Sequence, residues 1–173
     1  MSKPEKMKPG DRLGELMDFF DGYDTAVYTC EDDGYDYLEN GEYCVETDNP
    51  HGEDHLIIDI YRDESTLWYG DWSAQYQNTP KGMLHMKEDI GAFLDGRMYI
   101  AVVTEGDAWV CSITVGSGRV EKGALIRRIS EYLKSAGVEE WVKRIRADGA
   151  EVTCLWWDED RNDHFRIRPG EMA

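Results

Sequence analysis

The chain has 173 residues, of which 41% are apolar, and its 36 acidic residues outnumber 19 basic residues to give a net charge of −17. A chain of this length can bury about 70% of its unfolded surface, and six Trp, ten Tyr and four Phe are more aromatic residues than disordered chains contain. The negative charge repels nucleic acids and anionic lipids, which argues against direct binding to DNA, RNA or a membrane.

The N-terminal segment carries Lys3, Lys6 and Lys8 and two prolines but no apolar run. It therefore does not have the pattern of a signal peptide, and no stretch of the chain reaches transmembrane length. We interpret residues 1–10 as a flexible tail and expect residues 11–173 to fold as a single domain in the cytoplasm.

The cysteines show neither zinc-like nor redox-like spacing. They are Cys30, Cys44, Cys111 and Cys154. We expect four small, buried side chains in a reducing compartment, without a disulfide or a metal.

The negative charge is concentrated in the first half of the chain. Residues 1–96 contain 23 acidic and 7 basic residues, whereas residues 97–173 contain 13 and 12. No Lys or Arg lies between Arg12 and Arg62, and Leu13–Tyr61 holds fifteen acidic residues. Surfaces usually mix both signs because neighbouring opposite charges are favourable. A global adaptation to salt or solubility would acidify both halves, so the asymmetry favours a functional acidic surface over that alternative.

The first predicted element is a helix over Asp11–Asp21, because its apolar residues have the spacing of one buried helical face. They are Leu13, Leu16, Met17 and Phe20. Asp11 suits the N-cap and Gly22 the position after the helix. A short strand is predicted over Thr25–Cys30.

Residues 35–46 carry the clearest hairpin signal in the chain. Asn40-Gly41 is typical of a type I′ turn, which needs positive φ at both positions. In that register Glu39 faces Glu42, and the side chains of Tyr37 and Tyr35 face those of Cys44 and Glu46. This polar, tyrosine-bearing side is expected to face solvent.

The next segments predict a strand over 55–61, an aromatic-rich strand or strand pair over 65–77 and a short helix over 87–94. The second half predicts a hairpin over 97–115 that turns at Glu105-Gly106, helices over 121–136 and 138–147, and a last hairpin formed by 150–157 and 164–168. Hairpins dominate, so we expect an α+β fold: a mostly antiparallel sheet built from hairpins, with three to four helices packed on one face.

Two motifs resemble metal sites but do not match one. His51-Gly-Glu-Asp-His55 has the spacing of two zinc ligands on a helix, yet Asn49-Pro50 and the following strand pattern disfavour a helix there. The acidic run from Asp158 to Asp163 resembles the start of a calcium loop, but the required glycine is Asp163 and the last ligand position is Pro169. We predict no metal ligands.

The segment from Trp109 to Val138 resembles the acyl-CoA-binding turn of GNAT acetyltransferases. A strand is followed by Gly116-Ser117-Gly118-Arg119 and then by a helix that opens at Lys122-Gly123-Ala124-Leu125, and such a helix N-terminus can hold a pyrophosphate. The family pattern requires Gly three residues after its Gln or Arg, where this chain has Lys122. The resemblance covers about thirty residues and implies, as an alternative function, an acyltransferase that uses acetyl-CoA.

A row of carboxylates with interspersed tyrosines is the most distinctive feature of the chain. Residues i and i+2 of a strand are about 6.6 Å apart, which is comparable with the spacing of phosphates along a nucleic acid. Such a row can occupy the Lys/Arg sites of a nucleic-acid-binding groove, while tyrosines supply rigid contact area. The candidate partner-binding residues are Asp32, Asp33, Tyr35, Asp36, Tyr37, Glu39, Glu42, Glu46 and Asp48.

These residues suggest a non-enzymatic inhibitor that mimics nucleic-acid charge, similar in character to anti-CRISPR, antirestriction and nuclease-immunity proteins. It needs no cofactor, and its expected partner is a basic protein such as a nuclease or CRISPR effector. One alternative is a solvated acidic hairpin without a binding role. Another is an assembly protein whose oligomer interface is formed by exposed aromatic residues, with these candidates: Trp68, Trp72, Trp156 and Trp157.

Overall fold

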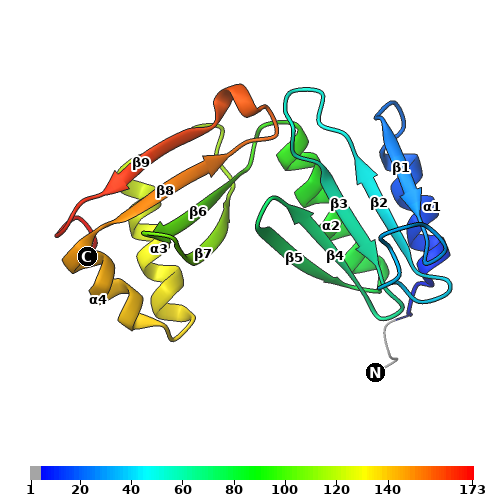
Figure 1. The fold of residues 1–173 in the computed structure, drawn as a ribbon, viewed down its shortest axis with the longest axis horizontal. Coiled ribbons are helices and arrows are strands. Elements are labelled where there is room, and N and C mark those ends of the chain that lie inside the picture. The colour runs from blue at the N-terminus through cyan, green and yellow to red at the C-terminus, as the bar shows by residue number, and fades with distance from the viewer. Residues whose placement is uncertain (1–4) are drawn as a thin grey trace. The chain divides into compact units, whose positions relative to one another are not determined.

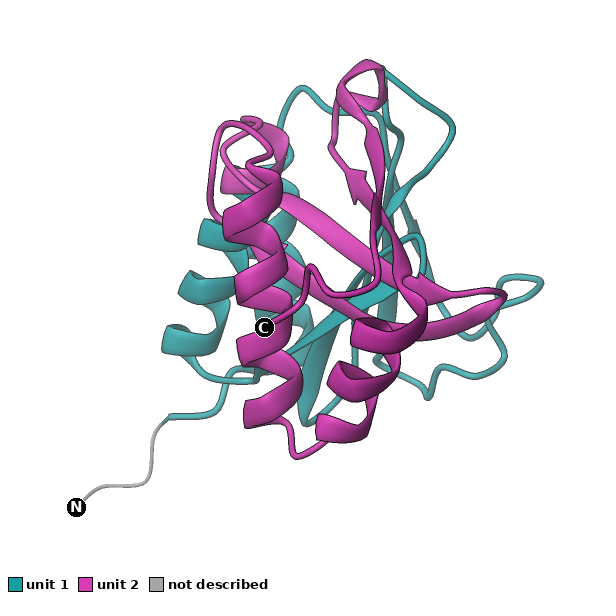
Figure 2. Ribbon diagram, turned by 90° about the vertical axis from the view of Figure 1, so that its left-hand side faces the viewer, with its two compact units in different colours: residues 1–91 teal, residues 92–173 magenta. Residues whose placement is uncertain are grey.

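The computed structural model describes residues 5–173, which form four α-helices and two antiparallel sheets of five and four strands (Figure 1). The predicted α+β class and the antiparallel pairing are confirmed. The chain divides into two compact units, Met1–Gly91 (unit 1) and Ala92–Ala173 (unit 2), each with one sheet (Figure 2). A single domain from residue 11 stays a prediction. Residues 1–4 of the predicted tail lie outside the described residues, and the first helix begins at Pro9.

Unit 1 is a five-stranded meander with two helices, and its strands lie in the order β1-β2-β3-β4-β5. Its elements are α1 (Pro9–Phe19), β1 (Thr25–Tyr28), β2 (Tyr43–Thr47), β3 (Leu56–Ile60), β4 (Glu64–Tyr69), β5 (Trp72–Gln77) and α2 (Pro80–Leu94), the last of which ends three residues beyond the boundary of the unit.

One face of this sheet forms the core of unit 1. Val45, Ile58 and Leu67 are cross-strand partners that alternation places on the same face, and all three are buried. The helices contribute further buried side chains, including Leu16 of α1 and Met86 of α2. The opposite face, which we call the open face, carries the alternate residues of the strands.

The predicted hairpin over residues 35–46 is wrong. β2 begins at Tyr43 and pairs with β1 and β3, while residues 29–42 form a loop of consecutive turns. Gly41 has φ 86°, but no described non-glycine residue, Asn40 included, has positive φ, so the type I′ turn is absent. The local Asn-Gly signal is overridden by the pairing of β1 with β2 and by burial of Leu38.

The helices of unit 1 differ from the predicted ranges at their N-terminal ends. α1 starts two residues early, with Pro9 as its first residue. α2 is 15 residues long because it starts at Pro80 rather than at residue 87. The Thr79 hydroxyl accepts a hydrogen bond of 3.1 Å from the Gly82 amide. A threonine cap followed by proline is a typical helix start.

Unit 2 is a four-stranded sheet covered on one face by two helices, and its strand order is β7-β6-β8-β9. Its elements are β6 (Tyr99–Glu105), β7 (Ala108–Val115), α3 (Lys122–Ser135), α4 (Glu139–Asp148), β8 (Ala150–Leu155), a short 3₁₀ helix η1 (Glu159–Arg161) and β9 (Asp163–Ile167). Its core joins alternate residues of β6, β7 and β8 to the apolar stripes of α3 and α4. Within residues 5–173, no helix is both long and apolar enough to cross a bilayer.

Candidate functional site

The loop of residues 29–42, which we call the acidic loop, is hydrogen-bonded to the open face of unit 1. The Tyr35 hydroxyl donates to Glu46 Oε1 at 2.5 Å, and the Tyr37 hydroxyl donates to Asp59 Oδ1 at 2.8 Å. The ring of Tyr35 also stacks on that of Tyr28, with 4.3 Å between centroids. These contacts hold the loop in one conformation against β2 and β3.

Asp59 lies beneath the loop and is only 5% exposed. Its Oδ2 accepts hydrogen bonds from the Trp68 indole at 3.0 Å and from the Tyr61 hydroxyl at 3.3 Å. No Lys or Arg among the described residues forms an ion pair with it, so neutral donors alone stabilise this buried carboxylate. Burial and then the charge of Asp59 raise the pKa of Tyr61 to about 12, and burial raises that of Tyr37 still further.

The sequence pattern alone does not single out Asp59. It lies between Ile58 and Ile60 in a strand whose alternation places it on the side away from the core, and such a position is usually a solvated one. The signal that distinguishes it is an acidic residue in the middle of an apolar strand whose cross-strand partners, Cys44 and Thr66, are also buried.

Glu42 closes the acidic loop and is buried. One carboxylate oxygen accepts from the Glu39 amide at 2.9 Å, and the other accepts from the Arg62 amide at 2.8 Å. One oxygen therefore closes the loop on itself and the other fixes it to the turn between β3 and β4, so Glu42 is not part of an exposed surface.

Five acids of the loop are exposed: Glu31, Asp32, Asp33, Asp36 and Glu39. Asp32 accepts from the Thr29 amide at 2.7 Å, and Glu39 forms an exposed ion pair of 3.3 Å with Arg62. Asp33 and Asp36 have no hydrogen-bond or ion-pair partner within residues 5–173. Tyr37, the next residue in the chain after Asp36, has 51% of its surface exposed.

The predicted binding residues from Asp32 to Glu42 all lie in the acidic loop, and Tyr35 joins that loop to Glu46, whereas Asp48 lies outside it. Asp48 follows the end of β2, whereas the acidic loop precedes its start, so the five-residue strand separates them. Asp48 pairs instead with His55 at 2.8 Å. Glu46 lies between them on the open face, partly exposed, beneath Tyr35.

The tryptophans predicted as a possible oligomer interface are mostly core residues. Trp72, Trp156 and Trp157 are buried, and only Trp68 of the four is exposed, at 37%.

All four cysteines are free thiols. Three of them are buried, and burial raises the pKa of Cys111 to about 11 and that of Cys154 to about 12, which keeps both thiols protonated.

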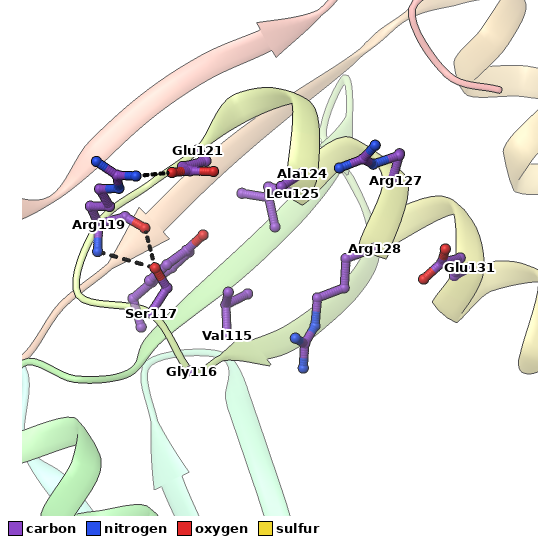
Figure 3. A pocket seen from close by; sticks show the side chains of 11 residues that line it. Val115, Gly116, Ser117, Arg119, Glu121, Ala124, Leu125, Arg127, Arg128 and Glu131 are labelled. Atoms are coloured by element: carbon purple, nitrogen blue, oxygen red, sulfur yellow. Dashed lines mark hydrogen bonds and ion pairs between the residues drawn. The ribbon is translucent and has the colours of Figure 1, made fainter.

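Unit 2 contains a pocket of about 650 Å³ at the turn that resembles the acyl-CoA-binding turn. Its walls are the β7–α3 loop, the first three turns of α3 and the start of β6. In Figure 3, Ser117 and Arg119 lie on one side of the pocket and Arg127 and Arg128 on the other. The pocket has mixed charge, because Glu121 and Glu131 also line it.

Comparisons of the chain with protein-family models, with curated proteins and with solved structures found no significant match.

Proposed function

We propose that unit 1 is a non-enzymatic binding module whose acidic loop occupies the nucleic-acid-binding surface of a basic protein. The observation that carries the proposal is a rigid loop that presents Asp33 and Asp36 without a neutralising partner among the described residues.

Rigidity supports a binding role because an ordered loop loses little conformational entropy when a partner binds. The hydroxyls of Tyr35 and Tyr37 are held by Glu46 and Asp59, and Glu42 closes the loop at its base. A loop that served only to keep the protein soluble would not need a buried carboxylate beneath it, since desolvating a charge costs free energy.

The chemistry of the surface favours a basic partner. Exposed carboxylates attract Lys and Arg side chains and speed the encounter. The Tyr37 ring and the neighbouring Trp68 give apolar contact area that is enriched at interfaces. A nucleic-acid-binding protein offers the matching pattern, a groove of basic side chains spaced to contact successive phosphates.

The test is a charge reversal that leaves the loop's own hydrogen bonds intact. The double variant Asp33→Lys with Asp36→Lys changes two carboxylates that form no hydrogen bond or ion pair with any described residue. Asp32 is not changed, because it accepts a hydrogen bond from the Thr29 amide. The matched control is Asp18→Lys with Glu88→Lys, which changes the net charge equally at exposed positions of α1 and α2. Circular dichroism and thermal unfolding show whether each variant folds.

The measurement is capture from a lysate, followed by elution with salt or with duplex DNA. We expect the wild type and the control to retain the same basic protein, which both salt and DNA release. The loop variant is expected to bind at least about a hundredfold more weakly, because like charges placed together cost several kcal/mol. Equal loss in the control would show that net charge alone acts, and release by salt but not by DNA would refute nucleic-acid mimicry.

A further inference from the structure

The pocket at the N-terminus of α3 has features that the acidic loop does not explain. It lies in unit 2, where 14 acidic and 12 basic residues give a net charge of only −2. Its volume of about 650 Å³ falls within the range of small-molecule sites, about 300–1,000 Å³. This inference is independent of the function proposed for unit 1.

The first feature is the hydroxyl, without a hydrogen-bond partner, of a buried tyrosine. Tyr99 is 1% exposed, its ring packs on Trp156 with 4.7 Å between centroids, and it lines the pocket. Its hydroxyl forms no hydrogen bond with any residue in the described part of the chain, and the oxygen atom keeps some accessible surface although the ring is buried. Burial raises the pKa of Tyr99 to about 12, and Arg128 opposes this shift, so the phenol stays protonated and is available to donate.

The second feature is unneutralised positive charge on α3. Arg119 is paired with Glu121 at 2.5 Å. Arg127 and Arg128 also line the pocket, but within residues 5–173 neither forms an ion pair. Arginine is suited to phosphate groups because its planar fork donates two parallel hydrogen bonds.

The third feature is the open N-terminus of α3. Its N-cap residue, Glu121, makes no side-chain hydrogen bond to the helix. The amides of Lys122, Gly123 and Ala124 have no acceptor among the described residues. Such amides and the helix dipole favour an anion, and Ala124 itself lines the pocket.

The loop that leads into α3 is held in place from outside the pocket. Arg161 of η1 lies 3.8 Å over the ring of Trp156 and donates to the Gly118 carbonyl at 2.9 Å. The wall formed by Ser117 and Arg119 is thereby tied to the β8–β9 connection. A preformed wall of this kind reduces the entropic cost of binding a ligand.

From these features we propose that the pocket binds an organic phosphate of nucleotide size. The phosphate lies between Arg127, Arg128 and the α3 amides, and the Tyr99 hydroxyl donates to it. The remainder of the ligand packs against Val115 and Leu125, and Glu131 accepts from one of its hydroxyl or amino groups. Free phosphate is too small to fill the volume, which is why an organic ester is favoured.

Isothermal titration calorimetry on the full chain tests the proposal with ADP, coenzyme A, pyrophosphate and adenosine. ADP or coenzyme A is expected to bind more tightly than pyrophosphate, and adenosine is expected not to bind. The tighter of the first two identifies which class of organic phosphate the pocket accepts. Absence of binding by both at about 1 mM, or equal binding of ADP and adenosine, would overturn the proposal.

Two variants of the pocket and a control distinguish binding at this site from a general attraction between phosphate and positive charge. Tyr99→Phe removes one hydroxyl and is expected to weaken the tighter phosphate ligand about tenfold, since a hydrogen bond to a charged group is lost. Arg127→Gln with Arg128→Gln is expected to weaken it further. The control, Arg97→Gln with Lys143→Gln, removes the same charge from exposed ion pairs in unit 2 and should bind as the wild type does. Equal weakening in the control would refute a built site, and thermal unfolding shows that each variant is folded.

Discussion

Arg12 joins α1 to the turn between β3 and β4 from inside unit 1, where it is 1% exposed. Its Nη1 donates to the Glu64 carbonyl at 2.8 Å and to Ser65 Oγ at 2.6 Å, and its Nη2 donates to the Tyr61 carbonyl. Burial lowers the pKa of the guanidinium, an effect that Asp63 and Glu42 oppose. The group stays charged, since Arg does not deprotonate in proteins, and it satisfies carbonyls that the turn would otherwise leave without donors.

We predict that Arg12→Leu lowers the free energy of unfolding by about 3 kcal/mol or more, because each buried group left without a partner costs about 1–3 kcal/mol. The matched control is Arg62→Leu, which removes an exposed ion pair and should cost less than about 1 kcal/mol. Urea unfolding measures both values. Similar losses in the two variants would show that the buried network contributes little.

At the scale of elements, the start of α2 depends on one glycine. The helix begins directly after β5, so its first turn folds back over the end of that strand. A Cβ atom on Gly82 would overlap the carbonyl oxygen of Gln77. The Cβ position and the carbonyl oxygen are both fixed by the backbone. Neither can move without disturbing the hydrogen bond between the Thr79 hydroxyl and the Gly82 amide.

We therefore predict that Gly82→Ala destabilises unit 1 by about 1–3 kcal/mol, the usual cost of overpacking. Gly14→Ala in the exposed middle of α1 is the control, because no heavy atom lies within 4 Å of its Cβ position. There alanine should stabilise by about 0.5–1 kcal/mol. Thermal unfolding distinguishes the opposite signs, and a stabilising Gly82→Ala would show that the first turn can relax.

The elements that the sequence predicted well are those specified by local patterns. The strand pair β4–β5 turns at Gly70-Asp71 within the expected range, and α3 spans almost the whole predicted segment. The hairpin at Asn40-Gly41 failed because β1, fifteen residues earlier in the chain, is the partner of β2. Non-local pairing of that kind leaves no short-range signature.

The candidate site was predicted in part, through reasoning that was only partly right. The expected neighbours of Tyr35 and Tyr37, namely Glu46 and Cys44, do lie against them. They meet because the loop folds onto the open face, not because the segments pair as strands. Asp59 was not predicted, and of the pocket in unit 2 only the turn from Gly116 to Leu125 was. The remaining contacts of both depend on residues that only the fold brings together.

At the scale of the whole molecule, the acidic charge belongs to one unit. Unit 1 contains 22 acidic and 7 basic residues, a net charge of −15, while unit 2 is at −2. Repulsion among like charges destabilises a compact state. This repulsion therefore destabilises unit 1 far more than unit 2. The stability of unit 1 should respond to ionic strength, and that of unit 2 should not.

We predict that raising NaCl from about 10 mM to about 1 M, which shortens the Debye length from about 30 Å to about 3 Å, slows amide hydrogen exchange in β3 several-fold more than in β6. Exchange measured by mass spectrometry reports both sheets in one sample, so unit 2 serves as the internal control for general effects of salt. An equal response of the two strands would show that self-repulsion in unit 1 is negligible. High salt is expected to release a basic partner and at the same time to stabilise unit 1. Loss of binding at high salt can therefore be assigned to screening of the acidic loop, because high salt does not favour unfolding of unit 1.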